Sequence, residues 1–318
     1  MRKIIFQLFI MIVFISCNQP KIKKSTYNIL DEKDRAIVRD EIIEDRFNHL
    51  LPKLMDETDI DMWVVISREY NEDPVIKTML PSVWLNARRR TILVFYRNKE
   101  NNTIEKLAVA RYDVGKNIKS AWNKEKEPNQ WKALSKIIEE RNPTKIGVNI
   151  SKHFALADGL VKTDHDEFIE NLSKENQQKI VSAEKLAIGW IETRTPKEME
   201  LFQKLVKITH DIIDEAFTNN VIKPGETTTD DVVWWMRQKV TDLGLSTWFH
   251  PTVDIQRSKV PLKSHIYSFS KAKDNQVILP GDLLHCDFGI SYIGLHTDCQ
   301  QHAYVLGKEE TDVPTFLA

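Results

Sequence analysis

Residues 279–307 read LPGDLLHCDFGISYIGLHTDCQQHAYVLG, and this stretch decides how the second half of the chain folds. Two strand-like segments flank a turn at about residues 291–294, which predicts an antiparallel hairpin. Pairing the segments around this turn places Asp287 nearly opposite Asp298, so that both side chains lie on one face with Cβ atoms about 5 Å apart. The stretch therefore predicts a hairpin that carries two neighbouring carboxylates.

The spacing of the two aspartates leaves two interpretations open. Aspartate is common near turns, so Asp287 and Asp298 can be ordinary solvent-facing residues. Alternatively, two carboxylates this close repel each other unless a positive charge lies between them. A divalent cation would supply that charge, and hard oxygen ligands suit Mn²⁺, Zn²⁺, Co²⁺ or Fe²⁺.

The surroundings of this pair resemble the metallopeptidase family with the pita-bread fold, which includes Xaa-Pro aminopeptidases, prolidase, methionine aminopeptidases and creatinase. In the hairpin, the resemblance is carried by Pro-Gly-Asp-Leu at 280–283, Asp-Phe-Gly at 287–289, Tyr292, Gly294 and Asp298. Upstream, Arg-Thr-Pro-Lys-Glu at 194–198 and Lys-Pro-Gly-Glu-Thr at 223–227 look like the opening of that catalytic domain. The α/β segment before it looks like the N-terminal domain of the Xaa-Pro and creatinase branch, so the resemblance covers nearly the whole chain after Lys21.

The resemblance implies roles for individual residues. In the family, the first aspartate of the pair chelates one metal ion and the second bridges two, which assigns Asp287 and Asp298 as ligands of two divalent ions (Mn²⁺, Zn²⁺ or Co²⁺). The implied substrate is a peptide with proline at its second position, hydrolysed at the bond before the proline. A catalytic histidine near the substrate is implied as well; His265 is the candidate and His250 its competitor. Each can also be an ordinary hydrogen-bonded loop histidine.

The family completes its metal site with a histidine and two glutamates well downstream of the hairpin, and the residues up to Ala318 contain no counterpart. We therefore expect an incomplete catalytic domain that is inactive as a peptidase, because two carboxylates are too few ligands for a tightly held metal pair. We also expect exposed apolar surface, and with it poor solubility or a disordered C-terminal half. Two other functions stay open: an inactive remnant that acts as a binding or interaction protein, and a creatinase-like non-peptidase amidinohydrolase.

The whole chain has the size and composition of a two-domain soluble protein. Of its 318 residues 42% are hydrophobic and 29% charged, and the net charge of −1 gives no field that favours nucleic acid. Helical and strand-like patterns alternate over residues 31–188, which predicts an α/β domain with a mixed sheet. A capping box at 195–198 starts a long amphipathic helix, and residues 189–318 are expected to form the partial α+β pita-bread domain. The resemblance also allows a homodimer.

The first 30 residues predict export and a lipid anchor. Arg2 and Lys3 precede an apolar run at 4–15 that is too short to span a bilayer but suits a signal peptide over residues 1–17. The run leads to Cys17, which resembles the lipidated cysteine of a bacterial lipobox, and a polar tether over residues 18–30 follows. An ordinary cleaved signal with an incidental cysteine is the alternative. We expect a protein of the bacterial cell envelope, anchored to the membrane on the periplasmic side or at the cell surface.

Two further cysteines, Cys286 and Cys299, are neighbours of the key aspartates. Alternation along a strand turns each cysteine side chain away from the adjacent aspartate. A disulfide across the hairpin and two small buried thiols both agree with the sequence, and the thiols are the preferred interpretation.

Overall fold

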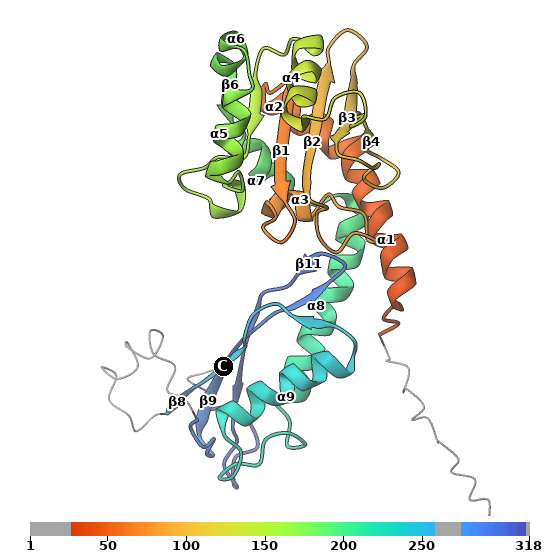
Figure 1. Cartoon of the computed structure of the whole chain (residues 1–318). Coiled ribbons are helices and arrows are strands. Elements are labelled where there is room, and N and C mark those ends of the chain that lie inside the picture. Colours follow the sequence, from red (N-terminus) through yellow and green to blue (C-terminus); the bar gives the residue numbers. More distant parts are fainter. Residues whose placement is uncertain (1–26, 258–274, 316–318) are drawn as a thin grey trace, which may run out of the picture.

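The computed structural model describes residues 27–257 and 275–315, which form two lobes joined by a long helix (Figure 1). The first lobe comprises residues 32–192 and the second lobe residues 196–304. Cys17 and His265, for which the sequence predicts roles, lie outside the described residues. Among the described helices, none is long and apolar enough to cross a membrane.

A mixed six-stranded sheet lies at the centre of the first lobe, in the order β4-β3-β2-β1-β5-β6. Its strands are β1 (Met62–Arg68), β2 (Arg90–Asn98), β3 (Thr103–Val109), β4 (Lys119–Ser120), β5 (Ile146–Val148) and β6 (Ile180–Ser182). Strand β2 pairs antiparallel with β1 and β3, whereas β5 runs parallel to β1 and β6. The predicted mixed α/β architecture is confirmed.

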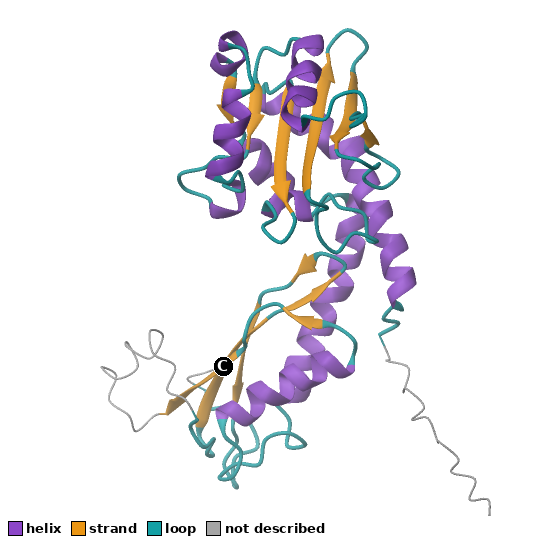
Figure 2. Ribbon diagram, viewed as in Figure 1, coloured by secondary structure: helices purple, strands orange, loops and turns teal. Residues whose placement is uncertain are grey.

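Helices cover both faces of this sheet (Figure 2). They are α1 (Glu32–Asp45), a π-helical turn (Arg46–Leu50), α2 (Leu51–Thr58), α3 (Pro74–Lys77), α4 (Gln130–Arg141), a 3₁₀ turn (Ala155–Ala157), α5 (Lys162–Glu170), α6 (Lys174–Gln178) and α7 (Glu184–Glu192). Along β1, Trp63 and Val65 face a core built with α2 and α7, whereas Met62 and Val64 face a second core built with α4. Because side chains alternate along a strand, an apolar strand of this kind is buried on both faces.

The second lobe has two helices and two small sheets. They consist of α8 (Pro196–Ala216), α9 (Thr229–Asp242), β7 (Ser246–Thr247), β8 (Thr252–Arg257), β9 (Asp282–Phe288), β10 (Ile290–Tyr292), β11 (Leu295–His296) and β12 (Cys299–Tyr304). The strand orders are β11-β10-β7 and β12-β9-β8. On β9, Leu284, Cys286 and Phe288 are buried in the core that α8 and α9 share with the strands. The alternate residues of β9, Asp287 among them, lie on the other face of the sheet.

Helix α8 begins at the predicted capping box. The hydroxyl of Thr195 accepts a hydrogen bond from Glu198 N–H, and the Glu198 carboxylate accepts one from Thr195 N–H at 2.8 Å. The same carboxylate accepts hydrogen bonds from Arg46 Nη1 at 2.8 and 2.9 Å, and both side chains are buried. Since Arg46 lies in the π-helical turn of the first lobe, this ion pair fixes the start of α8 to that lobe.

The described segments at the borders of the lobes each pack against one lobe. The expected domain boundary after residue 188 stays a prediction, and it falls within α7, whose Trp190 packs in the first lobe. Tyr27 and Ile29, at the end of the expected tether, pack against the core of the second lobe. Leu30 N–H also donates a hydrogen bond to the Tyr292 hydroxyl at 3.0 Å, so residues 27–30 lie on the second lobe.

Candidate metal centre

The predicted hairpin is present, and its turn has two residues. Tyr292 pairs with Leu295, which leaves Ile293 and Gly294 as the loop. Their φ values are 52° and 80°, and positive φ at both central residues is the conformation of a type I′ turn. The turn predicted at about residues 291–294 is therefore present, but its two-residue loop lies one residue nearer the C-terminus than the centre of that span.

The register of the hairpin differs from the prediction by two residues. Asp287 lies directly opposite Gln300 and not nearly opposite Asp298, so the predicted pairing is wrong. The physical reason is the position of the turn, because a two-residue loop at Ile293 and Gly294 sets the register of both strands. A shift of two residues preserves the face of a strand, so Asp298 remains a diagonal neighbour of Asp287 on the same face.

A close contact between the strands fixes the backbone beside Asp298, which lies in the break between β11 and β12. A Cβ atom on Gly289 would lie 2.1 Å from the carbonyl oxygen of Thr297, so only glycine fits there. The Thr297 hydroxyl accepts a hydrogen bond from Ile290 N–H at 3.0 Å and shares another with the Thr209 hydroxyl of α8 at 2.8 Å. Because both threonines are buried, this chain of hydrogen bonds anchors the residue before Asp298 to the helix.

The carboxyl group of Asp287 lies in an unfavourable electrostatic environment. Burial, and next the negative charge of the adjacent Asp298, raise the pKa of Asp287 above its usual range. The charge of His285 and a hydrogen bond from Gln300 lower the pKa, but to a smaller extent. Within the described part of the chain, the buried Oδ1 atom of Asp287 has no hydrogen-bond partner.

These features fit one side of a cation site. A divalent ion between Asp287 and Asp298 would offset their repulsion and give Oδ1 of Asp287 a partner. However, residues 27–257 and 275–315 contain no group of three or more His, Cys, Asp or Glu side chains that could hold a metal ion. The described residues thus offer two carboxylates for such an ion, which is fewer than the ligand sets of protein-bound divalent ions.

Comparison with known proteins identifies the fold. No protein-family model and no curated protein matches the chain. The solved X-Pro aminopeptidase from Thermotoga maritima MSB8 aligns with 81% of this chain and 66% of its own length, at 13% identity and a TM-score of 0.54. Aminopeptidase P from E. coli aligns with 89% of this chain and 64% of its own, at 12% identity and a TM-score of 0.55. This chain has the X-Pro peptidase fold.

A third solved structure agrees with this result. The Xaa-Pro dipeptidase from Bacillus anthracis covers 86% of this chain and 66% of its own length, at 16% identity and a TM-score of 0.50. The chain thus spans about two thirds of the length of the X-Pro peptidase structures that it matches. At this level of identity the likeness concerns the fold, and it is the fold that the sequence resemblance predicted.

Within the X-Pro peptidase fold, the predicted residues are only partly brought together. Asp287 and Asp298 are neighbours. His250 is exposed in the loop before β8, and its ring contacts the edge of Trp234, with the ring centroids 5.7 Å apart. Its Nδ1 atom lies 3.4 Å from Arg237 Nη1, so the contacts of His250 are with α9 and not with the aspartate pair.

Both described cysteines are free thiols. Cys286 is buried and Cys299 partly buried, which confirms the preferred interpretation of the two. Burial, together with the negative charge of Asp287, raises the pKa of the Cys286 thiol to about 12. A thiol of this kind is unreactive at neutral pH and serves as a small apolar residue of the core.

Gln300 and Asp254 lie near the aspartate pair, and the sequence did not point to either of them. Gln300 lies opposite Asp287, and the Oε1 atom of Gln300 is 3.2 Å from His285 Nε2. Asp254 on β8 pairs with His285 on β9, and burial raises the pKa of its carboxyl group. Alternation along β9 already places His285 on the face of Asp287, but the partner on β8 depends on a register that the sequence does not specify.

Proposed function

We propose that this chain carries part of the metal site of an Xaa-Pro-type metallopeptidase, with Asp287 and Asp298 as ligands. The observation that supports this most directly is the buried Asp287 Oδ1 atom, which lacks a partner in the described residues and lies beside a second carboxylate. Structures with the same fold include an X-Pro aminopeptidase and an Xaa-Pro dipeptidase. The proposed substrate is accordingly a peptide with proline at its second position, cleaved at the bond before the proline.

In this proposal the metal centre holds two divalent ions, of Mn²⁺, Zn²⁺ or Co²⁺. Asp287 would be a ligand of one ion and Asp298 a ligand of both, and the ions would supply a polarised water for hydrolysis once the ligand set is complete. Two carboxylates do not complete it, so we expect the 318 residues alone to bind metal weakly and to be inactive as a peptidase.

Metal titration of the purified chain tests the ligand assignment. Isothermal titration with Mn²⁺ should show weak binding, and Asp287→Asn and Asp298→Asn should each lower the affinity at least about tenfold, because each removes a charged oxygen ligand. Asp230→Asn is the control, since Asp230 is an exposed carboxylate of the same lobe in the first turn of α9, away from the pair. Unchanged affinity in both pair variants would contradict the assignment.

A second candidate function is that of an inactive remnant that acts as a binding protein. The absence of a third ligand beside the pair in the described residues favours it. The two candidates differ in one measurement, the hydrolysis of an Ala-Pro dipeptide by a chain that continues past Ala318 with a histidine and two glutamates. Activity of that longer chain supports the peptidase, whereas inactivity with Mn²⁺ bound supports the binding protein.

Two further assignments belong to this proposal. We assign His265 as the substrate-side histidine, with His250 as its competitor. In an active longer chain, His265→Ala should lower kcat strongly, whereas a larger effect of His250→Ala would favour the competitor. We also assign Cys17 as a lipid attachment site in the cell envelope; Cys17→Ser should abolish incorporation of labelled palmitate and release the protein from the membrane fraction.

A further inference from the structure

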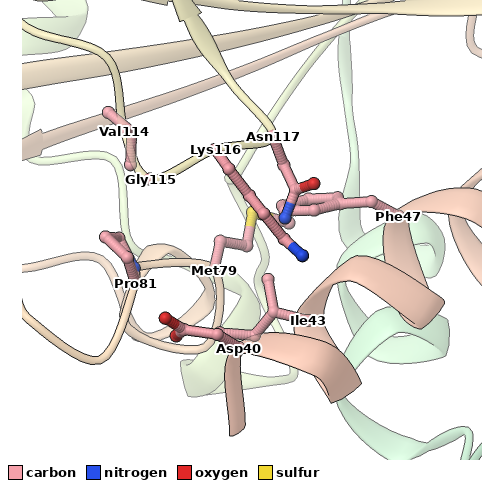
Figure 3. A pocket seen from close by; sticks show the side chains of 9 residues that line it. All are labelled: Asp40, Ile43, Phe47, Met79, Pro81, Val114, Gly115, Lys116 and Asn117. Carbon is pink, nitrogen blue, oxygen red and sulfur yellow. The ribbon is translucent and has the colours of Figure 1, made fainter. Parts of the chain in front are cut away.

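Two hollows on the first lobe differ in size and in charge. The smaller one, between α1 and residues 114–117, encloses only about 20 Å³, enough for one water molecule (Figure 3). Lys116 extends along it, and its ammonium group is neutralised by Glu44 at 2.6 Å. The larger hollow encloses about 300 Å³, which is at the lower end of the range for small-molecule sites.

The larger hollow, here called the arginine hollow, lies at one end of the central sheet. Its lining residues are Trp84, Arg88, Arg89, Arg90, Ala110, Arg111, Tyr112, Trp122 and Gln130. They come from the loop before β2 and its first residue, the segments after β3 and β4, and the start of α4; the antiparallel pairing of β2 with β3 brings the first two of these together. No acidic residue is among them.

The arginines of this hollow differ in their partners. Arg90 forms ion pairs with Asp164 at 3.1 Å and Glu167 at 2.8 Å, so its charge is balanced. Arg88, Arg89 and Arg111 are exposed and form no ion pair with any described residue. Three guanidinium groups without an ion-pair partner among the described residues thus place positive charge around one hollow.

Arg88 is held in place although no carboxylate of residues 27–257 or 275–315 binds its guanidinium group. Its guanidinium carbon lies 4.3 Å from the centroid of the Trp84 ring and 5.9 Å from that of Tyr112. Contacts with ring faces orient a guanidinium group and leave its N–H groups free for an anion. The indole N–H of Trp84 donates no hydrogen bond to a described residue and adds a further donor.

The loop that carries these residues is itself fixed. The side chain of Glu72 accepts a hydrogen bond from Ala87 N–H at 3.1 Å, and that of Glu69 accepts one from Arg89 N–H at 3.1 Å. The hydroxyl of Thr91 accepts a third from Arg88 N–H at 3.2 Å. A site whose donors are positioned before binding loses less entropy when a ligand arrives.

We propose that the arginine hollow binds a small molecule that carries a carboxylate or phosphate group on an apolar body. The guanidinium fork of Arg88 matches the planar arrangement of two oxyanion oxygens, and Arg89 and Arg111 add charge at the rim. The rings of Trp84 and Trp122 supply walls for the apolar part. This site lies on the first lobe, is independent of Asp287 and Asp298, and goes beyond the proposed peptidase function.

Binding of four probes to the full chain tests the proposal. 3-Phenylpropionate and phenyl phosphate carry an anion on an aromatic body, while acetate and inorganic phosphate carry the anion alone. Titration calorimetry and tryptophan fluorescence should show binding of at least one aromatic probe, at least tenfold tighter than its head group alone, and weakening with salt. The stronger of the two aromatic probes identifies the head group as carboxylate or phosphate.

Variants decide whether the hollow is the site. Arg88→Gln and Arg111→Gln should each weaken the aromatic probe, Arg88→Gln at least tenfold. Arg237→Gln is the matched control, because Arg237 also lies over a tryptophan, Trp234 at 4.9 Å, but on the second lobe. If Arg88→Gln fails to fold, the exposed Arg111→Gln carries the test. Absence of binding by both aromatic probes, or equal affinity in both hollow variants and the control, would overturn the proposal.

Discussion

Strand β9 carries one aspartate near each end, and the two carboxylates differ in their hydrogen-bond and ion-pair partners. Asp282 is fully buried, and Arg257 donates hydrogen bonds to both of its oxygens, from Nε at 2.6 Å and from Nη2 at 2.8 Å. Leu279 N–H donates another at 2.8 Å. Asp282 is therefore a buried ion whose charge and lone pairs are balanced by the protein itself.

Asp287, near the other end of the strand, receives no arginine or lysine partner from the described residues. Its buried Oδ1 atom has no hydrogen-bond partner there, and Asp298 adds a second negative charge. A carboxylate that is paired with an arginine serves the fold, whereas a carboxylate without a positively charged partner is available to bind a cation. This difference separates a structural aspartate from a candidate metal ligand on the same strand.

The largest loss of stability should come from Gly289→Ala, which perturbs the close contact between Gly289 and Thr297 beside the aspartate pair. The new Cβ atom would lie 2.1 Å from the Thr297 carbonyl oxygen, so the strands must move apart at a cost of about 3 kcal/mol or more. Urea unfolding followed by circular dichroism measures this loss. Gly294→Ala in the same hairpin is the control: nothing lies within 4 Å of its Cβ position, and only the strain of φ 80° remains, about 1 kcal/mol. Equal losses would show that the contact with Thr297 is unimportant.

Asp73 in the first lobe is an intermediate case, a buried carboxylate that has hydrogen bonds but no arginine or lysine partner in the described part of the chain. It accepts hydrogen bonds from Val75 N–H at 2.7 Å and Asn149 Nδ2 at 2.9 Å, yet burial raises its pKa to about 6. Between about pH 4 and pH 6 the folded state therefore holds a proton that the unfolded chain has lost. The resulting stabilisation of the folded state is fully present below about pH 4, is lost as the pH rises to about 6, and amounts to roughly 3 kcal/mol at most.

Asp73→Asn should remove this pH dependence, because asparagine does not titrate. The measurement is the free energy of unfolding between pH 4 and pH 7, for the wild type minus the variant. We expect the difference to change with the sign given above, in favour of the wild type at low pH. A difference that is constant across this range would show that the carboxylate remains ionised in the folded chain.

The direct comparison of the two ends of β9 uses Asp282→Asn and Asp287→Asn. Asp282→Asn leaves Arg257 without its counter-ion and should cost about 2 kcal/mol, since Arg257 is partly exposed and can regain water. Asp287→Asn removes a repulsive charge, so metal-free protein should keep its stability within about 0.5 kcal/mol or gain. Thermal unfolding in the presence of a chelator measures both. A loss at Asp287 as large as that at Asp282 would remove the distinction between them.

Much of the fold follows from local sequence signals. The capping box predicted at 195–198 begins α8 in the structure, and the alternating helical and strand-like patterns over residues 31–188 form the mixed α/β lobe. These signals involve residues only a few positions apart, so the sequence shows them directly. The register of the hairpin is different, because Ile293 adopts a positive φ that β-branched residues disfavour, and local preference therefore gives no signal for it.

The candidate site was predicted only in part, because some of its contacts join residues that are far apart in the sequence. The prediction placed Asp287 and Asp298 on one face by pairing across the turn, and an error of two residues in register keeps the same face, so this part held despite the wrong pairing. The contact between Thr209 and Thr297 joins a helix to a strand break far along the chain, and no spacing rule connects them. The lack of an arginine or lysine beside Asp287 among the described residues also depends on which residues the fold brings near, and not on the residues adjacent in sequence.

The smallest effect, that of Thr297→Val, tests whether this distant contact positions the aspartate pair. Valine has a similar shape but no hydroxyl, so Ile290 N–H loses its acceptor and the Thr209 hydroxyl loses a partner, at a cost of about 1 kcal/mol. If the contact only stabilises the lobe, the change should be confined to the unfolding free energy. If it also positions Asp298, the affinity for Mn²⁺ should fall several-fold as well. Thr297→Ser, which keeps the hydroxyl, should retain the metal affinity; a serine variant as weak as the valine variant would show that the methyl packing, and not the hydrogen bond, holds the carboxylates together.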